Sequence, residues 1–278
     1  MRALVLVLFG LLAGANVALA SPQRIVSINL CTDILALDLS SPGTLKSVFR
    51  VAADASDSPV ADKAENLPLN NATAEDIMSY KPDLVLAHAY SSPFTLKLLK
   101  QANIPVVQIK DAASFADVRS NVRTIADAMG VPEKGEAIIA RFDAVLAASA
   151  RPMRADAPRA VIYQDLGGAA AADTILGALL THTGFKNVIT AGSSGGFVNL
   201  TIEDLINTRP QFVAIGIYRP LQPSLAHEVL SHPALKAYVA AHARSLNLPA
   251  KLWTCGSPYV AGIATALAAA RDTYAVTQ

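Results

Sequence analysis

The sequence predicts an α/β protein with two similar lobes, mainly parallel sheets, a single long helix joining the lobes, and a ligand cleft between them. Three observations lead to this fold class. Buried strand patterns alternate with helical patterns, one segment of twenty residues occurs twice, and a long helical pattern lies between the two copies. Such alternation is typical of parallel sheets covered by helices.

The duplicated segment gives the clearest local structure. Residues 71–90 read NATAEDIMSYKPDLVLAHAY and residues 199–218 read NLTIEDLINTRPQFVAIGIY, with seven of twenty positions identical. Chance would give about one match at ordinary residue usage. In each copy a threonine caps a helix, an acid follows in the capping-box position, and a proline ends the helical pattern. A buried strand and a loop with a tyrosine come next, so each copy predicts a helix leading into a strand.

Related elements surround both copies. Strands are expected at 24–28 and 159–163, and each is followed by a loop and a helical pattern, at 34–39 and 174–180. A further helix and strand follow each copy of the repeat. Ligands in open α/β sheets bind outside the carboxyl ends of the strands. We therefore expect the binding site in the cleft between the two lobes.

The chain divides into four predicted parts. They are a signal peptide (1–20), an N-terminal lobe (21–130), a linking helix (131–153) and a C-terminal lobe (154–278). In the linking segment Pro132 is a plausible helix start, and apolar residues recur at helical spacing.

The first twenty residues have the pattern of a secretory signal. Arg2 supplies the positive start, an apolar run follows, and ALA at 18–20 predicts cleavage after Ala20. The run is too short to span a bilayer comfortably. We therefore expect a periplasmic mature protein. Without Arg2 this mature chain has 22 basic and 22 acidic residues. This balance gives no reason to expect nucleic acid or an acidic membrane as partner, and we expect a monomer.

Four segments carry a likeness to a known family: RIVSINLCTDILALDL, NATAEDIMSYKPDLVLA, NLTIEDLINTRPQFVAI and LWTCGSPYVAGIATALA. They resemble the periplasmic substrate-binding proteins of ABC importers for cobalamin, ferric siderophores and haem. The likeness covers essentially the whole mature chain. It implies two α/β lobes that move little on closing, no catalytic chemistry, and delivery of a small-molecule cargo to an inner-membrane permease driven by a cytoplasmic ATPase.

Two glutamates occupy matched positions at the starts of the repeated helices. Glu75 and Glu203 would interact favourably with the helix dipoles, by about 0.3–1 kcal/mol each. That interaction does not account for the same position being acidic in two lobes. In the resembled family, matched acids on the two lobes dock onto arginines of the permease, and this is the role we expect here.

The ligand-binding candidates are residues expected at strand exits around the cleft. They are His88, Tyr90, Tyr163, Gln164, Asp165, Phe197, Tyr218, Arg219 and Trp253. Aromatic faces suit a flat macrocycle or aromatic chelate, although any one ring could instead pack in the core.

The resemblance leaves the cargo open. Cobalamin binders of the family use several cleft aromatics, and Phe197 matches such a position. Hydroxamate-siderophore binders favour an arginine and tyrosine pair, as in Tyr218 and Arg219, and haem binders use a histidine or tyrosine, such as His88. A corrinoid is slightly favoured because the sequence shows no basic pocket, with a ferric siderophore or haem as alternative cargo.

Cys31 and Cys255 follow the first strand and precede the last helix. In an exported chain they could form a disulfide, or remain free thiols that touch the ligand, and the sequence leaves both possibilities open. The last helix is expected to be capped by Ser257 with Pro258 at its first position. The five histidines have no ligand partners at a standard spacing, so no dedicated zinc or manganese site is expected.

One motif points to another class of function. GSSGG at 192–196 matches G-x-S-x-G and would make Ser194 the nucleophile of a periplasmic serine hydrolase. Asp204 and His227 follow in the hydrolase order, but no helix follows the motif directly. The pattern therefore favours a Gly/Ser loop over the cleft.

Overall fold

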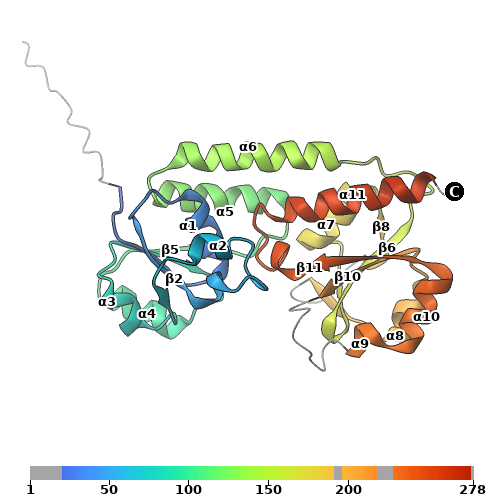
Figure 1. Cartoon of the computed structure of the whole chain (residues 1–278), viewed down its shortest axis with the longest axis horizontal. Coiled ribbons are helices and arrows are strands. Elements are labelled where there is room, and N and C mark those ends of the chain that lie inside the picture. Colours follow the sequence, from blue (N-terminus) through green and yellow to red (C-terminus); the bar gives the residue numbers. More distant parts are fainter. Residues whose placement is uncertain (1–20, 191–195, 218–227, 277–278) are drawn as a thin grey trace, which may run out of the picture.

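The computed structural model describes residues 21–190, 196–217 and 228–276, and it contains two α/β lobes side by side (Figure 1). Each lobe has one sheet with helices packed around it. The two-lobe α/β fold class expected from the sequence is confirmed.

The first lobe contains a five-stranded sheet in the order β3-β2-β1-β4-β5, and all neighbouring strands are parallel. The strands are β1 (Ile25–Ser27), β2 (Leu45–Phe49), β3 (Leu69–Asn70), β4 (Leu84–His88) and β5 (Val106–Ile109). The helices are α1 (Leu30–Leu39), η1 (Arg50–Ala53), α2 (Ala61–Ala64), α3 (Ala74–Ser79), α4 (Pro93–Gln101) and α5 (Phe115–Ala128). The carboxyl ends of β4 and β5 therefore lie next to each other.

The second lobe contains a mixed six-stranded sheet in the order β11-β10-β6-β7-β9, with β8 beside β6. The β10–β11, β10–β6 and β6–β8 pairs are parallel, and the β6–β7 and β7–β9 pairs are antiparallel. The strands are β6 (Arg159–Gln164), β7 (Gly168–Ala170), β8 (Lys186–Asn187), β9 (Phe197–Asn199), β10 (Phe212–Ile217) and β11 (Arg244–Pro249). The helices are η2 (Asp165–Gly167), α7 (Ile175–His182), α8 (Ile202–Asn207), α9 (Glu228–Ser231), α10 (Pro233–His242), η4 (Ala250–Leu252) and α11 (Val260–Val276).

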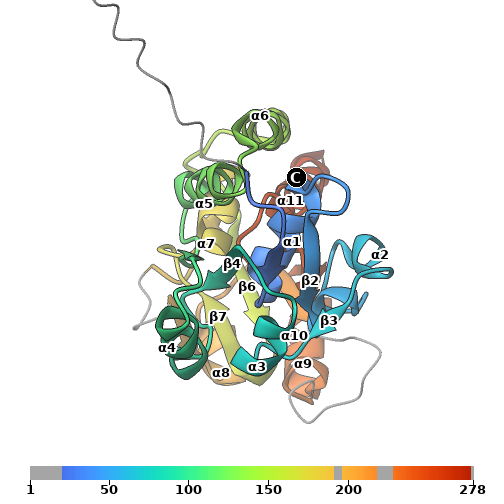
Figure 2. The same ribbon diagram turned by 90° about the vertical axis from the view of Figure 1, so that its left-hand side faces the viewer.

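Helix α6 (Pro132–Ser149) runs along one side of both lobes and packs against α5 and α11 (Figures 1 and 2). Ile138 and Ile139 belong to the hydrophobic core of the first lobe, whereas Phe142 and Leu146 belong to the core of the second. One helix is thus packed into two cores. A large change in the angle between the lobes would expose this apolar surface to water.

The two copies of the repeat form matching helix starts. The side-chain oxygen of Thr73 accepts a hydrogen bond from the Asp76 N–H at 3.3 Å, and that of Thr201 accepts one from the Asp204 N–H at 3.1 Å. The expected capping box does not form in the first copy. The Asp76 carboxylate instead accepts from the backbone N–H of Asn71 at 2.8 Å, because the chain folds back before the helix.

The predicted start of the last helix is wrong by two residues. Helix α11 begins at Val260, not at Pro258. The Val260 N–H donates to the Ser257 carbonyl at 3.0 Å, so residues 257–259 form a turn that precedes the helix.

Candidate ligand-binding site between the lobes

A cavity of about 520 Å³ lies where the two lobes meet, within the usual range for small-molecule sites. The first lobe contributes the segments that follow β4 and β5. The second lobe contributes the start of α7, the start of β9 and the segment after η4. The lining residues are Tyr90, Asp111, Ala112, Ala113, Asp173, Thr174, Ile175, Leu176, Gly196, Phe197, Trp253, Thr254, Cys255 and Gly256.

Three of the predicted ligand-binding residues line this cavity. Tyr90 is 76% exposed and Phe197 is 38% exposed, which is unusual for large apolar rings. Trp253 lines the cavity from the second lobe. Phe197 is the first residue of β9, so it begins a strand and does not lie at a strand exit as expected. The cavity is therefore lined by aromatic rings from both lobes.

Trp253 can lie against the sheet because Gly216 has no side chain. A Cβ atom at that position would lie 3.2 Å from the Trp253 ring and 3.1 Å from Cγ of Gln164. Both distances are tighter than ordinary contacts, so the glycine lets the indole ring approach the backbone of β10.

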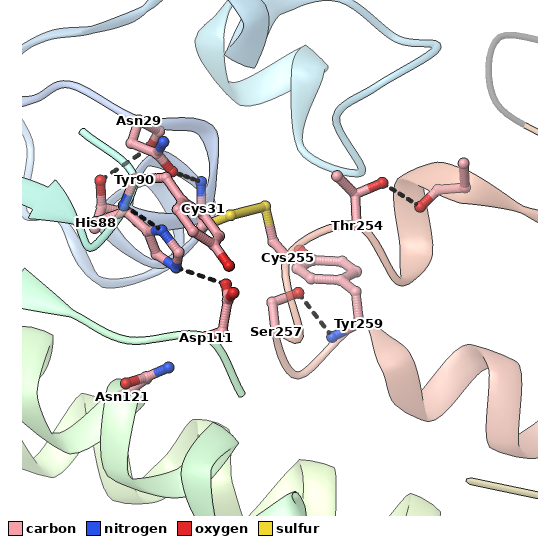
Figure 3. The surroundings of a disulfide bond; sticks show 12 residues. Asn29, Cys31, His88, Tyr90, Asp111, Asn121, Thr254, Cys255, Ser257 and Tyr259 are labelled. Atoms are coloured by element: carbon pink, nitrogen blue, oxygen red, sulfur yellow. Dashed lines mark hydrogen bonds and ion pairs between the residues drawn. A yellow bond between two sulfur atoms is a disulfide. The ribbon is translucent and has the colours of Figure 1, made fainter. Parts of the chain in front are cut away.

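On the first lobe, His88 lies behind the cavity wall and contacts a carboxylate that lines it (Figure 3). The imidazole is almost completely buried, and its Nε2 lies 3.2 Å from Oδ1 of Asp111. Its Nδ1 accepts a hydrogen bond from the Tyr90 N–H at 3.3 Å. Burial lowers the pKa of His88, although the Asp111 charge acts in the opposite direction. With Nδ1 as acceptor, the proton of the neutral ring sits on Nε2 and is donated to Asp111.

The charge of the cavity wall is negative. Asp111 and Asp173 line it from opposite lobes, and no lysine, arginine or histidine is among the lining residues within the described part of the chain. The Asp111 carboxylate raises the pKa of the Tyr90 phenol by hydrogen bonding and by its charge. Tyr90 is therefore kept as a neutral phenol.

The structure contains a disulfide bond between Cys31 and Cys255, with their Cα atoms 4.9 Å apart (Figure 3). The bond connects the first turn of α1 in one lobe to the segment before α11 in the other. Next to it, Gly256 packs so closely on Ala112 that a Cβ atom would lie 2.8 Å from the alanine Cβ. The Tyr259 hydroxyl also donates to Asp38 of the first lobe at 3.2 Å. The lobes are thus in direct contact beside the cavity.

The expectation that Tyr163 faces the cleft is wrong. Its side chain is completely buried and packs in a core cluster with Val161 and Leu205. Its hydroxyl donates to the carbonyl of Leu200 at 3.0 Å. Successive residues of a strand point to opposite faces: Tyr163 lies on the face covered by α8 and α10, and Ile162 lies on the face covered by α7 and α11.

The remaining candidates fall into two groups. His88, Gln164 and Asp165 lie near the strand ends but do not line the cavity. Gln164 is 9% exposed. Tyr218, Arg219 and Ser194 lie outside the described residues.

The two charged lining residues, Asp111 and Asp173, were not among the predicted site residues. Asp111 lies two residues beyond the end of β5, so the rule that ligands bind at carboxyl ends of strands could have found it. Asp173 precedes Thr174, the residue that caps α7, and has no comparable signal.

Within residues 21–190, 196–217 and 228–276, no group of three or more His, Cys, Asp or Glu residues could hold a metal ion. A search of the same ranges finds no helix with the length and hydropathy needed to cross a membrane.

Glu75 and Glu203 lie in the first turns of α3 and α8, and both side chains are exposed. The two helices lie on the side of the molecule opposite to α6, one in each lobe (Figures 1 and 2). Neither glutamate lines the cavity.

These features define a class of protein: two α/β lobes, linked by one helix, with a site of aromatic and acidic residues between them. The chain belongs to the periplasmic binding protein family, whose sequence model matches residues 25–246. The resemblance drawn from the sequence is thereby confirmed.

Particular relatives agree with this membership. The chain is 28% identical over 162 residues to the uncharacterised ABC transporter substrate-binding lipoprotein YvrC of Bacillus subtilis, a match that covers 54% of this chain and 51% of YvrC. It thus spans about half the length of that relative.

Two solved structures share the fold at low sequence identity. One is the periplasmic haem-binding protein BhuT in complex with two haems (TM-score 0.71, 22% identity, 91% of this chain and 98% of that one). The other is the vitamin B12-binding protein BtuF of Vibrio cholerae (TM-score 0.67, 16% identity, 91% and 98%).

Proposed function

We propose that this protein is the periplasmic substrate-binding component of an ABC importer and that its cargo is a corrinoid. The observation that carries the proposal is the cavity between the lobes, which has three aromatic rings and two carboxylates on its wall. The signal pattern of residues 1–20, with its expected cleavage after Ala20, supports export. No catalytic step is part of this function.

The chemistry of the cavity wall favours a corrinoid over the alternative cargoes. Aromatic rings provide a large contact area for a flat macrocycle at little cost in side-chain entropy. The amide groups at the edge of a corrin ring can donate hydrogen bonds to the carboxylates of Asp111 and Asp173. Haem carries propionates and many ferric chelates are anionic, so the same carboxylates would repel them.

Delivery to the permease would use the surface opposite to α6. Glu75 and Glu203 are exposed there at equivalent positions of the two lobes. Two like charges at fixed separation can set the register of a complex with basic residues of a partner. Because α6 packs into the cores of both lobes, the distance between Glu75 and Glu203 is expected to change little on docking.

Titration of the purified protein with dicyanocobinamide, cyanocobalamin, haemin and a ferric hydroxamate tests the cargo. Corrinoids should raise the thermal midpoint, since ligand at one hundred times Kd adds about 2.7 kcal/mol of stability. Phe197→Ala and Trp253→Ala should each weaken corrinoid binding by about tenfold, because each removes a stacking surface worth about 1.4 kcal/mol.

A matched control is Tyr274→Ala. Tyr274 lies near the end of α11, outside the cavity lining, and its ring contacts Arg244. This variant should bind corrinoids like the wild type. A Soret band on addition of haemin, with no response to either corrinoid, would contradict the corrinoid assignment and favour haem.

A further inference from the structure

The carboxylate of Asp111 is fixed in place by groups behind the cavity wall. Its side chain is 59% exposed, while the His88 side chain that contacts it is only 3% exposed. Because the Tyr90 N–H donates to Nδ1, the histidine has a single orientation in which Nε2 donates to Asp111. The rings of His88 and Tyr90 also lie 5.3 Å apart, centroid to centroid. A carboxylate held in this way loses little entropy when it binds a ligand.

The negative charge of Asp111 is not cancelled by its neighbours. Burial lowers the pKa of His88, so the imidazole beside it is neutral near pH 7. Tyr90 is likewise kept neutral by the carboxylate. Among the described residues, no lysine or arginine forms an ion pair with Asp111 or with Asp173. Within the part of the chain that the structure describes, the negative charge on two sides of the cavity therefore has no basic partner.

We infer that Asp111 and Asp173 select the cargo by charge, so that the site prefers a cationic corrinoid to a neutral one with the same macrocycle. This inference rests on the proposed function. A cation in the cavity interacts with both carboxylates, because Asp111 and Asp173 line it from opposite lobes. Coulomb attraction is stronger between walls of protein than at a flat surface, because less water surrounds the charges. The neutral ligand keeps the aromatic contacts but loses this attraction.

Cobinamide offers a pair of ligands that tests the inference. Aquocyanocobinamide carries one positive charge and dicyanocobinamide is neutral, while the corrin ring and its amide groups are the same. Asp111→Asn should weaken binding of the cationic ligand by about tenfold and change binding of the neutral ligand by less than about twofold, as expected for one lost charge interaction. The effect should shrink as salt is raised. Both proteins are measured at the same cyanide concentration.

Two further variants separate the charge effect from other causes. Asp173→Asn should likewise weaken binding of the cationic ligand and leave binding of the neutral ligand nearly unchanged. This residue belongs to the second lobe, so the change does not disturb the contact between His88 and Asp111. Asp127→Asn makes the same change in net charge on α5, at an exposed position outside the cavity, and should affect neither ligand. Thermal midpoints without ligand establish that each variant is folded.

The outcomes distinguish this inference from the proposed function. If the wild type binds both cobinamides and Asp111→Asn weakens them equally, charge selection is wrong while corrinoid binding stands. An equal effect of Asp127→Asn on the cationic ligand would also overturn charge selection at the site. If the wild type binds neither cobinamide, both the corrinoid assignment and the inference fail.

Discussion

The two copies of the repeat are alike on the outside of the molecule and different at the cleft. Position 88 of the first copy corresponds to position 216 of the second. In the first lobe His88 is buried and donates to Asp111, whereas in the second lobe Gly216 makes room for the ring of Trp253. Equivalent positions near the ends of equivalent strands thus support a carboxylate in one lobe and an indole ring in the other.

The features that the copies share determine the framework. Lys81 and Arg209 precede the repeated prolines, and both adopt a left-handed backbone, with φ of 49° and 46°. Residues other than glycine adopt this conformation rarely, so its presence in both copies marks a turn that the surrounding fold enforces. The retained threonines, acids and prolines therefore belong to the helix-to-strand unit and its exposed surface, whereas the substituted pair His88 and Gly216 shapes the surroundings of the cavity.

The largest expected effect comes from removing the covalent link between the lobes. Cys31→Ser combined with Cys255→Ser should lower the free energy of unfolding by about 2–5 kcal/mol, because the disulfide closes a long loop in the unfolded chain. Urea denaturation of both proteins measures the difference. In the unfolded wild type without reductant, thiol titration should detect no free thiol. Reductant should destabilise the wild type and leave the double variant unchanged, and two free thiols in the wild type would refute the link.

The second test asks whether the two lobes dock equivalently. Glu75→Lys and Glu203→Lys should each reduce transport by the reconstituted importer by about tenfold, and the double variant by more, because a like charge then faces the partner's basic residues. Corrinoid binding by the isolated variants should stay within a few-fold, since neither residue lines the cavity.

Glu136→Lys is the matched control for docking. Glu136 lies on α6, on the opposite side of the molecule, and forms an exposed ion pair with Arg123. Such pairs contribute little to stability. Transport with this variant should be normal. Full transport with the double reversal would show that the glutamates serve only the helix starts.

The framework could be predicted because its signals are local. The threonine caps at 73 and 201 and the apolar runs at β4 and β10 lie within single elements, and the structure has those elements at the expected places. The mixed sheet of the second lobe had no such signal, because the short strands β7 and β9 are set by pairing between distant segments.

The site was harder to predict because it depends on orientation. Tyr163 lies near the end of β6, as expected, but the alternation of side chains along this strand directs it into the core. His88 was expected to contact the ligand, but it lies against Asp111, which follows the neighbouring strand β5. Whether two cysteines 224 positions apart can pair depends on how the lobes meet, which no local pattern reveals.

The smallest expected effect concerns a polar cluster in the core of the first lobe. Ser27 occupies the position on β1 that Ile162 occupies on β6, and it lies beside other fully buried polar residues, among them Asp33. Asp33 accepts a hydrogen bond from the Phe49 N–H at 3.3 Å through Oδ1. Its Oδ2 has no hydrogen-bond partner among the described residues. Burial raises the pKa of Asp33 well above its usual value, although hydrogen bonds from Ser27 and the Phe49 backbone oppose this.

A raised pKa in the folded protein means that folding favours the protonated acid. The stabilising contribution is therefore complete below the unfolded pKa of about 3.9 and is lost as the pH rises through the folded pKa. Asp33→Asn has a similar shape and does not titrate. It should raise the thermal midpoint at pH 8 by about 3 °C, as expected for roughly 1 kcal/mol, and the gain should disappear towards pH 4. Asp83 provides the contrast: burial raises its pKa, but N–H groups of Gln23 and Arg24 outweigh this and the net pKa is lowered. Asp83→Asn should accordingly lose stability at neutral pH. A difference between wild type and Asp33→Asn that is the same at every pH would mean that this carboxyl does not titrate with folding.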